Sequence, residues 1–148
     1  MIRDVHVYFN KIDKMAHSFI NEKLKNSELS MGLFFYILEL EDHDGINLNH
    51  LSQCLFMDRA NTTRAITKLI KLGYVVKKTD EQDLRAYKLY LTEKGHSAAQ
   101  KLNDIFIEWR DLISEGVSDD EAEEVLAISK KLYANALKYY ESKNSSCN

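Results

Sequence analysis

The most constraining feature of the sequence is a short amphipathic stretch from Asp58 to Gly73. At the period of an α-helix, its apolar positions fall on one side, and its basic and hydroxyl-bearing positions fall on the other. Asp58 can accept hydrogen bonds from the first turn, and Gly73 can adopt the left-handed conformation that ends the last. The pattern predicts one bounded helix, which would pack through the methyl group of Thr62 and through Ile66, Leu69 and Ile70.

The opposite side of this helix is basic. Between Arg59 and Lys88 the chain has eight Lys and Arg residues and three acidic residues, a net charge of +5, whereas the net charge of the whole chain is −3. A basic patch on an acidic protein indicates a localised site for a polyanion. The charge count alone fits a solvated helix face equally well, so the neighbouring elements must decide between the two.

Helical periodicity also predicts the elements that precede the basic helix. Apolar residues recur every three or four positions through Ile2–Leu24, which indicates a long amphipathic helix. Ser30 can cap a second helix that ends at Asp42–Gly45, and Asn49–Cys54 forms a short third one. Two short helices joined by a tight turn, the second one basic, predict a helix-turn-helix. The second helix would pack through Leu33, Phe34, Ile37, Leu38 and the stem of Glu41.

Two β-rich segments follow the basic helix. Tyr74–Thr79 and Ala86–Leu91 contain many β-branched and aromatic residues, and the polar residues 80–85 separate them. This pattern predicts a β-hairpin with a charged tip. A helix-turn-helix followed directly by a hairpin is a winged helix, whose hairpin can reach the DNA backbone or the minor groove.

Two further amphipathic helices are expected at the C-terminal end. Thr92 can cap a long helix that ends at Gly116, and Ser118–Glu121 matches a capping box. Their apolar sides could close on one another within a monomer, but helices at opposite ends of a chain that surround a DNA reader more often form a two-fold dimer interface. The predicted fold class is therefore mainly α with a small β-hairpin wing. The expected regions are a winged helix-turn-helix DNA-binding domain at 29–96, embedded in a helical dimerisation region at 1–25 and 97–148.

Several classes of protein are disfavoured by the composition. No apolar run is long enough to cross a bilayer, and the N-terminus lacks the apolar region of a signal peptide, so a cytoplasmic protein is expected. The cysteines Cys54 and Cys147 lack metal-binding spacing, and the five histidines form no ligand pair one helical turn apart. We therefore expect no bound metal and no cofactor. A nucleophile elbow and a phosphate-binding glycine loop are both missing, so we expect no enzyme.

Cys54 lies next to the basic helix and could sense oxidation. A sensing cysteine needs an electropositive setting that lowers its pKa, and the helix that contains Cys54 supplies no Lys or Arg. An incidental thiol is the favoured interpretation.

The order of elements and three motifs resemble the MarR family of bacterial transcriptional regulators. The motifs are Asp58–Arg64 followed by Leu69 and Gly73–Val75, Asp80 with Asp83–Arg85 at the hairpin tip, and Leu91–Gly95. The resemblance covers nearly the whole chain. It implies a homodimer in which the first and the last two helices of each chain intertwine, and which binds pseudo-palindromic double-stranded DNA operators. It also implies repression of the protein's own or neighbouring genes, relieved by a small aromatic or phenolic ligand. The oxidation-sensing branch of the family has its cysteine in the first helix, where this chain has none.

The residues expected to contact DNA lie on the basic helix and on the wing. Arg64 can read a guanine through two hydrogen bonds, and Asn61 and Thr63 can bond to base edges or phosphates. Lysines are expected to contact phosphates without reading sequence. The recognition-helix set is Arg59, Asn61, Thr62, Thr63, Arg64, Thr67, Lys68 and Lys71, with helix packing as the alternative role for Thr62 and Thr67. The wing set is Lys77, Lys78, Asp83, Arg85 and Lys88, with plain solvation as a comparable alternative for the three lysines.

At the wing tip, Arg85 would enter the minor groove or bind a phosphate. Asp83 would orient that arginine by a charge-assisted bond. A surface ion pair between the two is the alternative, and the family resemblance favours the DNA-facing roles.

The effector pocket is predicted only from the family resemblance. The candidates, from helices that line the family's cleft, are Phe9, His17, Phe34, Tyr36 and Trp109, although an aromatic on such a stripe is more often simple core.

A function of another class also fits the sequence. The winged helix could serve as a protein-interaction or dimerisation module that does not read DNA, with its basic face bound to an acidic partner. Replacing Arg64 and Arg85 with alanine separates the two hypotheses, because only a DNA reader has operator binding to lose.

Overall fold

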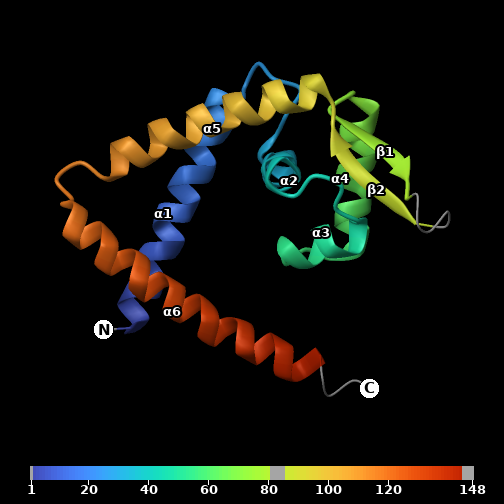
Figure 1. Cartoon of the computed structure of the whole chain (residues 1–148). Coiled ribbons are helices and arrows are strands. Elements are labelled where there is room, and N and C mark those ends of the chain that lie inside the picture. The colour runs from blue at the N-terminus through green and yellow to red at the C-terminus, as the bar shows by residue number, and fades with distance from the viewer. Residues whose placement is uncertain (1, 81–85, 145–148) are drawn as a thin grey trace. The chain divides into compact units, whose positions relative to one another are not determined.

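The computed structural model describes residues 2–80 and 86–144, with side chains described from 4 to 80 and from 86 to 140. The described part of the chain forms two compact units, Met1–Arg110 and Asp111–Asn148. It contains six helices and one antiparallel hairpin (Figure 1). The elements are α1 (Ile2–Lys23), α2 (Met31–Asp42), α3 (Leu48–Cys54), α4 (Arg59–Lys71), β1 (Val75–Thr79), β2 (Tyr87–Leu91), α5 (Glu93–Ile113) and α6 (Asp119–Asn144). The predicted fold class, mainly α with a hairpin wing, is confirmed.

The core of the first unit is built around α2. This helix is apolar on most of its circumference, and Phe34 and Ile37 are completely buried. Side chains from every neighbouring element of the unit complete the core. Those with at most 1% of their surface exposed include Ile20 from α1, Leu51 from α3, Leu69 from α4 and Leu102 from α5. Since burying one such side chain stabilises a fold by about 1.5–3 kcal/mol, α2 holds α1, α3, α4 and the part of α5 up to Arg110 in one packed unit.

The helix-turn-helix forms as the sequence predicts. Asn47 caps α3 by accepting a hydrogen bond from the His50 backbone N–H at 2.9 Å, and Asp58 caps α4 through the Asn61 N–H at 2.8 Å. The turn between the helices contains Phe56, which has a left-handed backbone with a φ of 51°. This conformation is unfavourable for a residue with a side chain, and it reverses the chain sharply enough to start α4 three residues later, at Arg59.

The hairpin pairs Val75 with Leu91 at its base and Thr79 with Tyr87 near its tip. An isolated bridge between Ile46 and Leu89 joins this sheet to the connection between α2 and α3. The Leu89 N–H donates to the Ile46 carbonyl at 2.9 Å, so the base of the wing is anchored to the helical core. The predicted tip residues Asp83 and Arg85 lie outside the described residues.

Four local predictions need correction. Ser30 occupies the position before α2, but its side chain makes no cap hydrogen bond. Ile70 is 38% exposed, because Ala65, Ile66 and Leu69 already fill the packed side of α4. Glu41 is exposed and its carboxylate pairs with His96 at 2.6 Å instead of packing through its stem. The helix α5 ends at Ile113, three residues before the left-handed Gly116.

The second unit consists of the end of α5, a turn and α6. The predicted capping box is present: the Ser118 N–H donates to the Glu121 carboxylate at 2.9 Å, and the Glu121 N–H donates to the Ser118 hydroxyl at 3.4 Å. The bonds that the backbone N–H and the hydroxyl of Ser118 donate to the carboxylate lower the pKa of Glu121. Among the described helices, none is long and apolar enough to span a bilayer.

Candidate nucleic-acid interface

A chain of polar contacts runs along the exposed side of α4 through its first two turns. The Asp58 carboxylate accepts from the backbone N–H of Asn61 and also from its side-chain amide. The amide oxygen of Asn61 accepts in turn from the guanidinium of Arg64. The side-chain nitrogen and the side-chain oxygen of Asn61 therefore both take part in hydrogen bonds. Asp58 and Asn61 together fix Arg64 against the start of the helix.

Thr63 and Thr67 lie on the same exposed side. Each donates its hydroxyl hydrogen to the carbonyl four residues earlier, Thr63 to Arg59 and Thr67 to Thr63, both at 2.7 Å. Both side chains are exposed. Their hydroxyl oxygens keep lone pairs for an external donor.

Thr62 does not belong to this surface. Its side chain is fully buried, and its hydroxyl donates to the Asp58 carbonyl at 3.1 Å and lies 3.5 Å from the hydroxyl of Tyr36. A side chain without exposed surface cannot reach a base edge, so Thr62 is removed from the DNA-contacting set. Tyr36, predicted for an effector pocket, is a core residue in this structure, with 4% of its surface exposed.

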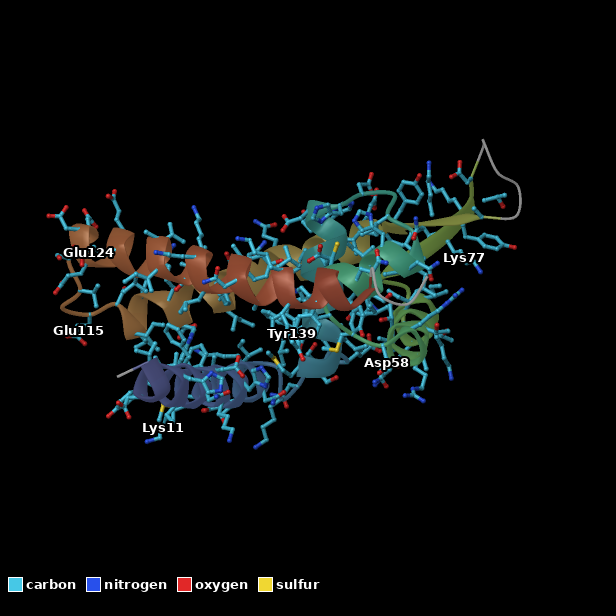
Figure 2. The ribbon with its side chains drawn as sticks, turned by 90° about the horizontal axis from the view of Figure 1, so that it is seen from below. Lys11, Asp58, Lys77, Glu115, Glu124 and Tyr139 are labelled. Carbon is cyan, nitrogen blue, oxygen red and sulfur yellow. The ribbon has the colours of Figure 1, made fainter. Side chains whose placement is uncertain are left out.

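The basic residues of the predicted DNA-contacting set differ in their surroundings. On α4, Arg59, Lys68 and Lys71 are exposed. On the wing, the Lys77 ammonium lies 3.6 Å from the ring centroid of Tyr87, and Lys78 lies 4.8 Å from that of Tyr90. Figure 2 marks Asp58, at the start of α4, and Lys77, on the hairpin.

The wing lysines also differ in charge compensation. Lys88 forms an ion pair with Asp80 at 3.3 Å. Its charge is thus partly compensated within the hairpin, whereas Lys77 and Lys78 are oriented by aromatic faces that leave the charge intact.

A hollow of about 670 Å³ lies between the helix-turn-helix and the wing. It brings Arg59, Thr63 and Thr67 of α4 together with Lys77 of the wing. Further residues that the sequence analysis did not single out also line the hollow. They were missed because polar side chains on a short helix carry no distinctive periodic signal. These are Asn49, His50 and Gln53 of α3 and Tyr87 of β2.

Only one of the aromatic residues predicted for an effector pocket lines the hollow between α2 and α5. Phe34 lines a smaller hollow of about 230 Å³ between α2 and α5, but Phe9, His17, Tyr36 and Trp109 do not. The ring of His17 lies 6.2 Å from Phe35, and the ring of Trp109 lies 5.4 Å from Phe19. The hollow is lined by Phe34, Phe35, Leu38, Glu41, Asp42, Asn103 and Phe106.

Cys54 is half-buried at the end of α3. Burial raises the pKa of its thiol, and the nearby Glu39 carboxylate raises it further. A raised pKa lowers the thiolate fraction, which is the reactive form. Among the side chains of residues 4–80 and 86–140, no three from His, Cys, Asp or Glu are grouped closely enough to hold a metal ion.

Comparison with known proteins identifies the family. A model of the MarR family matches residues 34–86, which include the helix-turn-helix and β1. The HTH-type transcriptional regulator BilQ of Clostridioides difficile (strain CD3) is 34% identical over 103 residues, which are 70% of this chain and 70% of that protein. The chain belongs to the MarR family of transcriptional regulators. The BilQ protein of Clostridium symbiosum is 25% identical over 77% of this chain and 79% of its own length.

Solved MarR structures share this fold over nearly the whole chain. A MarR transcriptional regulator from Methanosarcina mazei Go1 has a TM-score of 0.84 at 29% identity and covers 93% of this chain and 99% of its own. A MarR protein from Peptoclostridium difficile has a TM-score of 0.86 at 29% identity, over 94% and 91% of the two chains. Both BilQ relatives are HTH-type transcriptional regulators. This MarR-family member is a DNA-binding regulator with a winged helix-turn-helix.

Proposed function

We propose that the protein is a homodimeric repressor that inserts α4 into the major groove of a pseudo-palindromic operator near its own or neighbouring genes. The observation that carries the proposal is the ordered exposed side of α4, where Asp58 and Asn61 hold Arg64. A guanidinium that is fixed before binding loses less conformational entropy on binding than a free one. Arg64 would donate two hydrogen bonds to a guanine, and Thr63 and Thr67 would accept from neighbouring bases.

The remaining bases would supply affinity. Arg59, Lys68 and Lys71 on α4 and Lys77 and Lys78 on β1 would contact phosphates, which adds salt-dependent binding without sequence information. Lys88 would contribute less, since Asp80 compensates its charge. The α3 residues Asn49, His50 and Gln53 line the same hollow as the α4 face and would contact the adjacent backbone. The proposed wing-tip roles of Asp83 and Arg85 rest on the family resemblance.

Exposed apolar side chains support the homodimer. Soluble monomers rarely expose large contiguous apolar surfaces, and such surfaces on long helices are typical of subunit interfaces. In α1 the side chains of Val5, Val7, Tyr8, Phe9, Ile12 and Met15 are each at least 38% exposed. In the second unit, the α6 side chains of Val125, Leu126, Ile128, Tyr133, Tyr139 and Tyr140 are each at least 53% exposed.

Operator binding is tested by fluorescence anisotropy with duplexes from the region upstream of the gene. The wild-type protein should bind one duplex at least a thousandfold more tightly than random sequence at physiological salt, as specific regulators do to the order of ~10³ or more. Arg64→Ala should weaken that binding by about 1–3 kcal/mol, whereas Lys25→Ala, which removes an exposed charge outside α4, should not. Equal affinity for operator and random duplexes would overturn the proposal and favour the protein-interaction module.

The dimer is tested by light scattering coupled to size exclusion. The 17.2 kDa chain should elute with twice that mass. A monomer at micromolar concentration would contradict the homodimer.

The proposed effector is a small aromatic molecule. The hollow between α2 and α5 indicates that a neutral or cationic molecule would bind there better than an anionic one. Three phenylalanines line this hollow together with the carboxylates of Glu41 and Asp42. Carboxylates repel an anionic ligand and attract a cation, which the aromatic rings also favour. A neutral or cationic aromatic ligand therefore fits better than an aromatic acid. Release of operator by benzoate but not by benzylamine would contradict this restriction.

A further inference from the structure

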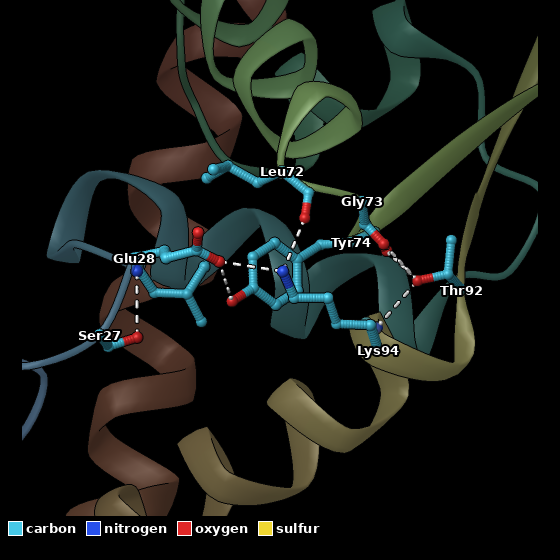
Figure 3. Close-up of polar contacts among 9 residues, drawn as sticks. Ser27, Glu28, Leu72, Gly73, Tyr74, Thr92 and Lys94 are labelled. Atoms are coloured by element: carbon cyan, nitrogen blue, oxygen red, sulfur yellow. Dashed lines mark hydrogen bonds and ion pairs between the residues drawn. The ribbon is translucent and has the colours of Figure 1, made fainter.

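The end of α4 is attached to the start of α5 through three successive backbone carbonyls. The Lys94 ammonium donates to the carbonyl of Leu72 at 2.8 Å, and the Thr92 hydroxyl donates to that of Gly73 at 2.7 Å (Figure 3). The backbone N–H of Thr92 donates to the carbonyl of Tyr74 at 3.0 Å. Leu72 is the C-cap of α4, so Lys94 partners a carbonyl at the negative end of the helix dipole.

The same ammonium reaches a third segment of the chain. Lys94 donates to the carboxylate of Glu28 at 2.9 Å, and Glu28 lies in the connection between α1 and α2. The Tyr74 hydroxyl donates to the same carboxylate oxygen at 3.4 Å, and the ammonium lies 4.3 Å from the centroid of the Tyr74 ring. The hydrogen bond between Glu28 and Lys94 lowers the pKa of the carboxyl group and raises that of the ammonium. Both groups are therefore charged at neutral pH.

The backbone at this joint is also tightly packed. A Cβ atom added at Gly95 would lie 2.2 Å from the carbonyl oxygen of Tyr74. The first turn of α5 therefore touches the chain that leaves α4, and only glycine permits so close an approach. The joint combines a fixed backbone contact with one long side chain that connects it to Glu28, in the segment between α1 and α2.

We propose that Lys94 is a positioning residue for DNA readout, which fixes the direction of α4 relative to α1 and α5. The inference rests on the proposed function. In the proposed dimer, α1 and α5 belong to the pairing helices and α4 reads the half-site, so the joint transmits the geometry of the dimer to the recognition helices. Without the Lys94 contacts, α4 would keep its sequence-reading face and would lose its fixed orientation.

A loosened joint has a specific consequence for a two-fold reader. The separation of the two recognition helices determines which half-site spacing the dimer accepts. Replacing Lys94 with methionine keeps the length of the side chain and removes its donor and charge. The Lys94→Met dimer should therefore discriminate less than the wild type between the native operator and operators with altered half-site spacing. A simple loss of stability would not change this discrimination.

The test measures anisotropy binding of the folded dimer to duplexes with the native spacing and with one base pair inserted or deleted. Lys94→Met should bind the native operator about tenfold more weakly, as expected for loss of one charged hydrogen bond. Its ratio of native to altered affinity should fall toward one. Lys94→Arg should restore the wild-type ratio. The control Lys101→Met, which removes an exposed charge from the same helix, should leave the ratio unchanged.

Circular dichroism and light scattering establish that each variant is a folded dimer before binding is measured. Should Lys94→Met fail to fold, Glu28→Ala removes the link to the segment between α1 and α2 and leaves the bond to Leu72, and it should shift the spacing ratio in the same direction. A Lys94→Met or Glu28→Ala dimer with the wild-type ratio of native to altered affinity overturns the role of Lys94 and leaves the proposed function standing. A wild-type protein without any operator preference overturns the proposed function instead.

Discussion

Replacing Gly95 with alanine should separate α5 from the end of α4. The added Cβ would lie 2.2 Å from the Tyr74 carbonyl oxygen and 3.0 Å from the Cβ of Leu91. Carbon and oxygen atoms that are not bonded need about 3.2 Å, so one of the two segments must move by roughly 1 Å. The carbonyl cannot turn away at no cost, because it accepts a hydrogen bond from the Thr92 N–H at 3.0 Å.

The energetic terms have opposite signs. Overpacking a well-filled site costs about 1–3 kcal/mol, and weakening one backbone hydrogen bond adds about 1 kcal/mol. Alanine gains up to about 1 kcal/mol over glycine through helix propensity, and less in a first turn. The expected net effect is a loss of about 1–3 kcal/mol in the free energy of unfolding. For a chain of this size, this corresponds to a fall in Tm of roughly 2–12 °C.

The assay is urea and thermal unfolding at one fixed protein concentration, because dimerisation would make Tm concentration-dependent. Gly32→Ala provides the matched control. Gly32 lies in the first turn of α2, and the nearest atom to an added Cβ is the Ser30 hydroxyl oxygen at 3.8 Å. This control should stabilise the protein by a few tenths of a kcal/mol. A Gly95→Ala protein as stable as the Gly32→Ala protein would refute the close packing at the joint.

Three other predictions concern single side chains. Thr62→Val should lower the free energy of unfolding by about 1 kcal/mol and leave operator selectivity unchanged. Thr63→Val should leave the free energy of unfolding unchanged and reduce operator selectivity; unfolding and anisotropy measurements distinguish the two variants. In a Cys147→Ser background, Cys54 should react with Ellman's reagent more slowly in the folded protein than in urea, because a raised pKa reduces the thiolate; equal rates would contradict this. Glu28 has a folded-state pKa below its ordinary 4.5, so its contribution to stability is present above pH 4.5 and is lost as the pH falls through the folded value. The stability difference between wild type and Glu28→Gln should shrink from pH 7 to about pH 3, and a constant difference would argue against the ion pair.

Local signals in the sequence were sufficient to locate the start of every described helix and both ends of each strand to within three residues. The caps at Asp58 and Ser118 are contacts over three residues, and they were predicted because both partners lie in the same turn. Ser30 was predicted by the same reasoning and makes no side-chain cap, since a suitable residue type is only a permissive condition.

Contacts between distant segments were not predictable in this way. The partners Glu28 and Lys94 are 66 residues apart, and Tyr36 and Thr62 are 26 residues apart. Helical periodicity placed Thr62 on the packed side of α4 but could not show that its hydroxyl meets a buried tyrosine. The wing lysines were predicted as equivalent, and only the strand register shows that Lys88 has an acidic neighbour while Lys77 has an aromatic one.

In the proposed operator complex, the hydrogen bonds that the Thr63 and Thr67 hydroxyls donate would limit which DNA bases these residues can favour. Each hydroxyl hydrogen is already donated to the helix's own backbone. Adenine and cytosine present amino hydrogens in the major groove, whereas guanine and thymine present oxygen acceptors opposite them. Opposite these two threonines, adenine or cytosine can be bound without breaking a bond in the protein. In the proposed complex, guanine or thymine would require each hydroxyl to rotate and give up its bond, so we expect these two positions to favour amino-bearing bases.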